Sequence, residues 1–277
     1  MKHPNFILFI FLITLLSCSD DENETTSVTA SSADNNASLH AAFNEFDSGN
    51  FTITKDADKV TLVTTGLPNH KSPYWSNTKT RSISGPNGQD VTGPAATNHP
   101  LWVEATVADE NNMAPGNIDD FNGSYSLTVS ANPTKATTTS ATGLGAIGFA
   151  ISGSVIYNDE EGPGIPLSNA AGGLDFNGAH TGPQSYHYHL EPVSFSSNDS
   201  NLIGIISDGF FIYGRKCASV GSYPSDLDVS GGHVSTTQHT TTAEYHYHLQ
   251  NSITNINGTG YYILFPGDYQ GTPNAIR

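Results

Sequence analysis

Short hydrophobic runs separated by turn-forming residues make up most of the chain beyond residue 38. Each run alternates apolar and polar positions or is wholly apolar, and Gly, Pro, Asn or Asp bounds it on both sides. Such runs are typical of β-strands. The clearest are 50–66, 101–107, 124–131, 145–158, 202–214 and 260–267. The pattern predicts one all-β, sandwich-like domain with long loops and little helix, and residues 36–45 (NASLHAAFNE) are the best helical candidate.

The first residues predict a secretory signal. Lys2 precedes an apolar run from Phe6 to Leu16, which is too short to span a bilayer stably. The letters LLSC that end at Cys18 resemble a bacterial lipobox. This resemblance implies that residues 1–17 are a signal peptide removed before Cys18, and that Cys18 carries lipid. The alternative is an ordinary signal peptide that merely contains a cysteine.

Residues 18–38 are polar and acidic, which predicts a disordered tether. Their first acidic positions, in SDDE (19–22), resemble the export signal of Bacteroidetes lipoproteins. That likeness implies a lipoprotein anchored in the outer membrane by its N-terminal lipid and exposed on the cell surface; an orientation toward the periplasm is the alternative. Residues 39–277 are expected to form the folded domain, which is long enough to build its own hydrophobic core.

Charge narrows the range of partners. The chain has 26 acidic and 10 basic residues, a net charge of −16. Such a chain is repelled by phosphate backbones, so we expect no nucleic-acid partner. Cation binding is compatible with this charge. If Cys18 carries lipid, Cys217 is the one other cysteine, and the mature chain then forms no internal disulfide.

Two stretches of the chain repeat the same motifs in the same order. IGFAISGSVIYN (147–158) aligns without a gap with IGIISDGFFIYG (203–214), and five of the twelve positions are identical. LDFNGAH (174–180) then pairs with LDVSGGH (227–233), and each copy closes with YHYHL. We interpret residues 145–192 and 201–250 as a duplicated unit arranged around a pseudo-two-fold axis.

The repeated histidines are candidate metal ligands. Side chains alternate between the two faces of a strand, so the two histidines of each YHYH point one way and its tyrosines the other. Imidazole binds Zn and Cu well, and a third histidine precedes each YHYH at the end of Leu-Asp-x-x-Gly-x-His. The aspartate of that motif is either a further ligand or the partner that orients a ligating histidine. The predicted metal residues are His180, His187, His189, His233, His246, His248, Asp175 and Asp228.

A purely structural role for these motifs is the competing interpretation. A His-x-His strand can be a cross-strand pairing surface, and Asp175 can cap a turn while His180 bonds to the backbone. The spacing also leaves open whether the two halves share one metal site or form two. It does not decide between a structural, stored, sensed or catalytic metal, so an enzymatic role is undecided.

The chain resembles the YHYH family of secreted and lipoprotein bacterial domains. YHYHL, LDVSGGH and DGFFIYG carry the resemblance, and GLPNHKSPYW (66–75) is similar to a stretch near the start of such domains. The likeness runs from about residue 50 to 250 and implies a transition-metal site, with Cu or Zn as the ion.

A binding module for glycans or protein partners is the alternative function. Trp75, Trp102 and the twelve tyrosines of the chain are the residues that a sugar-binding face would use. In that case the YHYH strands serve as scaffold, and a glycan or another small molecule is the ligand.

Overall fold

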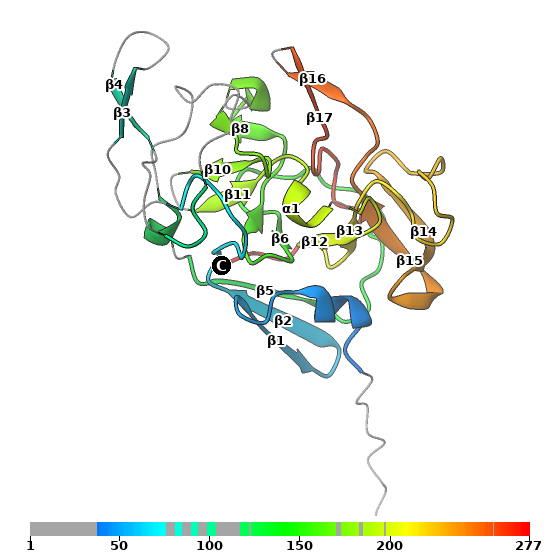
Figure 1. Cartoon of the computed structure of the whole chain (residues 1–277). Helices are drawn as coiled ribbons and strands as arrows, with labels where there is room; N and C mark the ends of the chain where they lie inside the picture. Colours follow the sequence, from blue (N-terminus) through cyan, green and yellow to red (C-terminus); the bar gives the residue numbers. More distant parts are fainter. Residues whose placement is uncertain are drawn as a thin grey trace, which may run out of the picture. The chain divides into compact units, whose positions relative to one another are not determined.

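The computed structural model of the protein describes residues 38–75, 81–84, 90–93, 99–103, 117–121, 123–169, 173–182, 185–196, 198–256 and 258–277 (Figure 1). All of them belong to one compact unit, Asn36–Arg277. The predicted signal peptide 1–17, the lipid site Cys18 and the tether to residue 37 lie outside the described residues.

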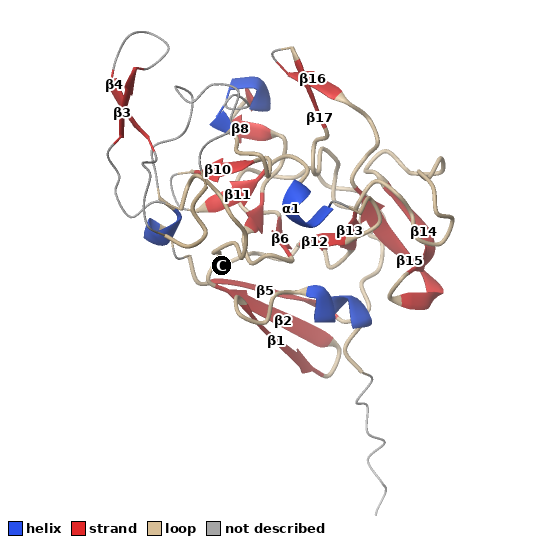
Figure 2. Ribbon diagram, in the orientation of Figure 1, coloured by secondary structure: helices blue, strands red, loops and turns tan. Residues whose placement is uncertain are grey.

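The regular structure is mostly β, as the hydrophobic pattern predicted (Figure 2). The N-terminal strands are β1 (Phe51–Asp56), β2 (Lys59–Thr64), β3 (Arg81–Ser84), β4 (Asp90–Gly93) and β5 (Tyr125–Ser130). The middle strands are β6 (Gly148–Ala150), β7 (Val155–Ile156), β8 (Glu160–Gly162), β9 (Ile165–Pro166), β10 (Ala179–Thr181) and β11 (Tyr186–Tyr188). The C-terminal strands are β12 (Leu202–Ile206), β13 (Phe211–Tyr213), β14 (Gly232–Thr237), β15 (Thr240–His248), β16 (Thr254–Ile256) and β17 (Thr259–Tyr261).

The described helices are short. They are α1 (Val193–Ser196) and the 3-10 helices η1 (Ala41–Glu45), η3 (Ile118–Asp120) and η4 (Leu167–Asn169). The predicted helix at 36–45 is therefore one 3-10 turn over its second half. It begins where the His40 ring accepts a hydrogen bond from the Ala42 amide, and it ends because Phe46 is extended. Of the predicted strand at 101–107, residues 101–103 form a single bridge through Trp102, and the rest lies outside the described residues.

An eight-stranded sheet carries both YHYH segments. Its order is β10-β11-β7-β6-β12-β13-β15-β14, so the order of motifs in the second four strands mirrors that in the first four. In each half a hairpin (β10–β11 or β14–β15) pairs in parallel with the short strand that ends the Ile-Tyr motif (β7 or β13). The antiparallel pair β6–β12 joins the halves, and the two hairpins lie at opposite ends of the sheet (Figure 1). A duplication remains an interpretation of the sequence; the structure adds the same local pairing in both halves.

Two glycines let the central strands approach closely. A Cβ atom on Gly148 would lie 2.5 Å from the Ile205 carbonyl oxygen, and one on Gly204 would lie 2.1 Å from that of Phe149. Side-chain carbon atoms do not approach carbonyl oxygens this closely. These are the two glycines that match in the aligned Ile-Gly stretches, so both stretches have a glycine at the contact that joins them.

Hydrophobic side chains cover both faces of the eight-stranded sheet. Leu202 and Ile205 of β12 point to a core shared with the three-stranded sheet β1-β2-β5, whereas Ile203 and Ile206 point to a second core on the opposite face. The adjacent residues Ile205 and Ile206 alternate between the two faces as in a regular strand, and the register shift between Leu202 and Gly204 puts Leu202 on the same face as Ile205. The packing of one sheet on the other agrees with the predicted sandwich-like domain.

Candidate metal centres

The six repeated histidines form two separate buried triads. The first triad is His180, His187 and His189; the second triad is His233, His246 and His248. The hairpin registers build them: His180 on β10 lies opposite His187 on β11, and His233 on β14 lies opposite His246 on β15. All six side chains are buried. The sequence did not decide whether the two halves share one metal site or form two. In the structure the histidines come together as two separate groups.

The tyrosines of both YHYH segments point to the opposite face of the sheet. Tyr186, Tyr188 and Tyr247 are fully buried in the core there. The Tyr188 hydroxyl lies within hydrogen-bonding distance of His70 Nε2, at 2.5 Å, and of Ser152 Oγ, at 2.7 Å. The predicted division of faces is therefore present, and the tyrosines hold the strands in place while the histidines face each other.

In the first triad the Nε2 atoms converge. His180 Nε2 lies 3.0 Å from His187 Nε2, while His189 Nε2 is buried without a hydrogen-bond partner. His187 Nδ1 lies 3.0 Å from the Ser185 carbonyl oxygen, and His189 Nδ1 lies 2.6 Å from that of Asn158. The ring of Tyr157 stacks on His187 with 3.9 Å between centroids, which closes the triad on that side.

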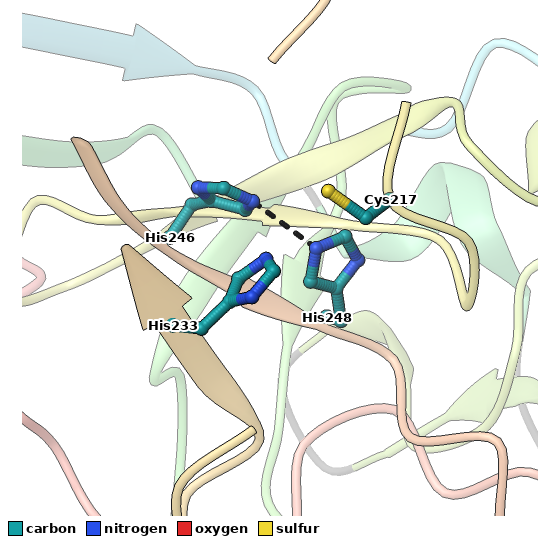
Figure 3. Close-up of side chains that lie close together, drawn as sticks. All are labelled: Cys217, His233, His246 and His248. Carbon is teal, nitrogen blue, oxygen red and sulfur yellow. Dashed lines mark hydrogen bonds between the residues drawn. The ribbon is translucent and has the colours of Figure 1, made fainter. Parts of the chain in front are cut away.

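The second triad also brings its Nε2 atoms together, but a different pair of its histidines is closest (Figure 3). His246 Nε2 and His248 Nε2 lie 3.1 Å apart, and His233 Nε2 is buried without a partner. His246 Nδ1 contacts the Glu244 carbonyl oxygen at 3.0 Å, and His248 Nδ1 contacts that of Gly214 at 2.7 Å. His233 Nδ1 lies 2.9 Å from Asp226 Oδ1.

These Nδ1 contacts determine where the ring protons lie. A carbonyl or carboxylate oxygen only accepts, so each of these Nδ1 atoms must donate a proton. A neutral imidazole has one ring proton, which leaves Nε2 as a bare lone pair in all three histidines of the second triad. The 3.1 Å contact drawn in Figure 3 therefore joins two acceptors rather than a donor and an acceptor. A cation at the centre of the triad would satisfy all three.

Burial keeps five of the six triad histidines neutral. It lowers the pKa of His180 to about 3 and the pKa of His189 to about 4, and it lowers the pKa of His187 well below its usual range. In the second triad, burial lowers the pKa of His246 and of His248 to about 4. Neutral imidazole is the form that binds metal, so the rings are in the ligating state at neutral pH.

We expect acid to destabilise the metal-free protein through these histidines. An unfolded histidine titrates near pH 6.5, whereas His246 and His248 titrate at about 4 in the folded chain. Below about pH 6.5 the unfolded state binds more protons, so the free energy of unfolding falls as the pH decreases toward 4. Above pH 6.5 these rings are neutral in both states and add no pH dependence. Urea denaturation of the chelated chain should show a lower midpoint at about pH 5 than at about pH 7.5.

The matched comparison is His246→Gln, also free of metal. Its urea midpoint should change less between the two pH values, because one of the rings that must gain a proton on unfolding is gone. An identical pH dependence in the variant and the wild type would contradict this assignment.

The predicted aspartates lie outside both triads. Asp175 Oδ2 accepts hydrogen bonds from the Ser72 and Tyr186 hydroxyls, at 2.6 and 2.7 Å. Asp228 Oδ2 accepts from Lys135 Nζ and the Tyr245 hydroxyl, at 3.1 and 3.0 Å. Each Oδ1 accepts from two backbone amides of its own turn. Because these donors already occupy the carboxylate oxygens, Asp175 and Asp228 are not candidate metal ligands in this structure.

Each aspartate shapes the turn that delivers the third histidine of its triad. Gly178 and Gly231 have φ values of 65° and 81°, a left-handed conformation that glycine adopts readily. Their amides donate to the carbonyl oxygens of Asp175 and Asp228, both at 2.9 Å. The motif Leu-Asp-x-x-Gly-x-His is therefore a structural turn whose last residue is a candidate metal ligand.

Replacement of Asp175 by Ala should be strongly destabilising. The carboxylate is 5% exposed, and its removal leaves two hydroxyls and two amides without an acceptor in a buried site. We expect a loss of about 3 kcal/mol in the free energy of unfolding, measured by urea denaturation. Asp228→Ala is the matched control. Its side chain is 30% exposed, so water can replace it, and the loss should be about 1 kcal/mol. Equal losses would contradict this account.

The sequence left Asp228 as either a ligand or the partner that orients a histidine; in the structure it is Asp226 that contacts and orients His233. Its carboxylate accepts the Nδ1 proton of His233, and this hydrogen bond holds the pKa of Asp226 below its usual range. Such carboxylate–histidine pairs fix the tautomer and raise the basicity of the ligand nitrogen. Asp226 lies outside the repeated motif, so sequence spacing did not single it out.

Two further donors near the triads were not predicted as ligands. Cys217 belongs to the second cluster, in which one ligand atom from each of its four residues lies within 4.8 Å of the others. Glu161 Oε1 lies 3.3 Å from His189 Nε2 and 3.5 Å from His180 Nε2. The sequence does contain a signal: Glu161 is four residues after Tyr157, and Cys217 is four residues after Tyr213. Extension of the aligned Ile-Tyr stretches by a few residues would have paired them.

The two tryptophans offer little surface for a sugar. Trp75 is 4% exposed, and its ring stacks on His99 with 4.3 Å between centroids. Trp102 is half-buried and packs against the same core. Neither tryptophan supplies the open aromatic face that the alternative function needs.

Comparison with known proteins gives one match. The model of the family described as "YHYH protein" matches residues 126–225. This stretch contains the first triad and Cys217, and it ends before the second triad. No curated protein and no solved structure matches the chain. Among the described residues, no helix has the length and apolar character needed to cross a membrane. The predicted family is thus confirmed for this stretch, and the chain carries a domain of the YHYH protein family over residues 126–225.

Proposed function

We propose that the domain binds two transition-metal ions, Cu or Zn, one in each histidine triad. The observation that carries the proposal is the set of Nδ1 contacts in the second triad. His233, His246 and His248 all donate from Nδ1, so three buried Nε2 lone pairs face one point. An uncompensated arrangement of this kind is costly in a buried site, and a metal ion compensates it.

Burial of the triads favours a retained ion over an open catalytic centre. His189 Nε2 and His233 Nε2 are shielded from solvent, and Tyr157 stacks over His187. A catalytic metal keeps an open position for water or substrate, whereas a structural or stored ion is enclosed by protein ligands. The proposed role is therefore to hold the metal, either as a structural element or as cargo.

Elemental analysis of the full chain tests the proposal. The chain is purified without a histidine tag, stripped with chelator, dialysed against Zn or Cu, and freed of unbound ion. We expect two ions per chain. A folded chain that retains neither Zn nor Cu would mean that the YHYH strands are scaffold. That result would favour the alternative function, a binding module for glycans or protein partners.

We also propose that the chain is a lipoprotein anchored in the outer membrane through Cys18 and exposed on the cell surface. The lipobox-like LLSC and the acidic residues after it support this. Labelling of growing cells with a radioactive fatty acid should label the wild-type chain and leave Cys18→Ala unlabelled. Protease added to intact cells should digest an exposed chain. Absence of label in the wild type contradicts the anchor, and protection from protease favours the periplasm-facing orientation.

A further inference from the structure

The two triads differ in the residue that stands beside them. The Ile-Tyr stretches of the two halves continue as Asn158 to Glu161 in one and Gly214 to Cys217 in the other. The carbonyl oxygens of Asn158 and Gly214 accept the Nδ1 protons of the last YHYH histidines, His189 and His248. Three residues after Asn158, the carboxylate of Glu161 lies at the first triad. Three residues after Gly214, the thiol of Cys217 lies at the second triad.

Glu161 reaches the first triad from β8. Its side chain is 16% exposed, and Oε1 is buried without a hydrogen-bond partner. The same atom lies 3.3 Å from His189 Nε2, which is also buried and unpartnered. Neutral His189 donates from Nδ1 to Asn158, so its Nε2 has no proton to offer the carboxylate. When Glu161 is ionised, two acceptors therefore face each other here, and burial raises the pKa of Glu161 to about 7.

Cys217 reaches the second triad from the loop after β13. Its side chain is 1% exposed, and Figure 3 shows the sulfur beside the rings of His246 and His248. Ser219 Oγ lies 3.0 Å from Sγ, where its hydroxyl can donate to a thiolate, and the Cys217 thiol donates to Ser235 Oγ at 3.8 Å. The unpartnered Nε2 of His233 is an independent sign that this cluster can accept a cation.

The distances suit four-coordinate sites. Two nitrogen or oxygen ligands that each lie about 2.0–2.1 Å from a tetrahedral ion are roughly 3.3–3.4 Å apart. The Glu161 oxygen lies 3.3 and 3.5 Å from His189 and His180, and the Nε2 pairs lie 3.0 and 3.1 Å apart. Cys217 already lies within 4.8 Å of the ligand atoms of the second triad, whereas Glu161 must move toward His187 to complete a four-coordinate first site.

We infer that the two metal centres have different donor sets: three imidazoles and the Glu161 carboxylate at the first triad, and three imidazoles and the Cys217 thiolate at the second. This inference rests on the proposed function. Soft thiolate favours Cu(I), whereas a carboxylate with imidazoles favours a harder ion such as Zn(II). The chain is therefore a two-metal carrier with one softer and one harder centre, rather than a protein with two copies of one site.

Cobalt(II) loading tests the donor sets, because a cobalt thiolate has a near-ultraviolet charge-transfer band that nitrogen and oxygen ligands lack. The full chain is used in a Cys18→Ser background, so that Cys217 is its one thiol. We expect two bound cobalt ions and a charge-transfer band that saturates with one of them. Cys217→Ser should lose the band. Glu161→Gln should keep the band and should weaken the other cobalt ion at least about tenfold.

Mixed loading then tests the metal preference. Cu(I) and Zn(II) are added together under reducing conditions, with two ions of each metal per chain, so that either metal alone could fill both sites. We expect one copper and one zinc per chain, and we expect Cys217→Ser to lose the preference for copper while near-ultraviolet circular dichroism confirms its fold.

The failures are distinguishable. Two cobalt ions without a charge-transfer band, or a Glu161→Gln variant that binds both ions as tightly as the wild type, would overturn the assigned donors and leave the proposed function intact. Binding of two identical ions from the mixture would overturn the assigned preference. A folded chain that binds no cobalt, zinc or copper would contradict the proposed function itself.

Discussion

The His187→Ala and His246→Ala variants are each expected to bind one transition-metal ion instead of two, and the double variant is expected to bind none. Each substitution removes one of three converging Nε2 atoms, which should weaken its own site by more than about 100-fold. The two histidines lie on β11 and β15, with four strands of the same sheet between them. Loss at one site should therefore leave the other intact. Elemental analysis after dialysis measures both losses.

His70→Ala is the matched control. His70 is a half-buried histidine, and burial lowers its pKa to about 4, but its Nε2 contacts the Tyr188 hydroxyl on the opposite face of the sheet. This variant should keep both ions. If each single triad variant loses both ions while His70→Ala keeps them, the triads form one coupled site rather than two independent ones.

Metal loading should raise the melting temperature of the chain substantially. Each site that holds its ion at about 1,000 times the dissociation constant adds about 4 kcal/mol to the free energy of unfolding, because the unfolded chain has no assembled triad. For a domain of this size about 1 kcal/mol shifts the melting temperature by about 2–4 °C. Two sites should together add at least about 10 °C, measured by differential scanning calorimetry with and without chelator.

The His187→Ala, His246→Ala double variant provides the control for this prediction. Its melting temperature should respond little to either zinc or chelator. A wild-type chain whose melting temperature is the same in chelator and in excess zinc would contradict metal binding by the folded state.

The alternation of side chains in a strand explains why the histidine triads could be predicted. Once YHYH is a strand, the period of two puts His187 and His189 on one face and the tyrosines on the other, whatever the rest of the fold does. The third histidine could be predicted because it recurs at the same place in both halves. These expectations depend on local geometry, which a sequence pattern contains.

The role of the aspartates could not be predicted in the same way. Asp175 is near His180 in sequence, but its carboxylate turns to Ser72, more than a hundred residues away, and to Tyr186. Carboxylates that accept backbone amides in a turn and carboxylates that bind metal have the same spacing. The difference lies in what the tertiary structure places opposite them.

The remaining donors depend on how loops close. Glu161 and Cys217 reach the triads because β7 and β13 pair in parallel with the YHYH strands, and parallel pairs are joined by long connections. The strand order and the number of sites depend on the same non-local pairing. Neither follows from hydrophobic period or from motif spacing.

The most direct test of the two-metal account is anomalous X-ray diffraction from crystals of the zinc-loaded chain, recorded on both sides of the zinc absorption edge. The account predicts two strong anomalous peaks, each about 2.0–2.1 Å from three Nε2 atoms, one among His180, His187 and His189 and the other among His233, His246 and His248. Peaks elsewhere on the chain, with both triads free of anomalous density, would contradict it.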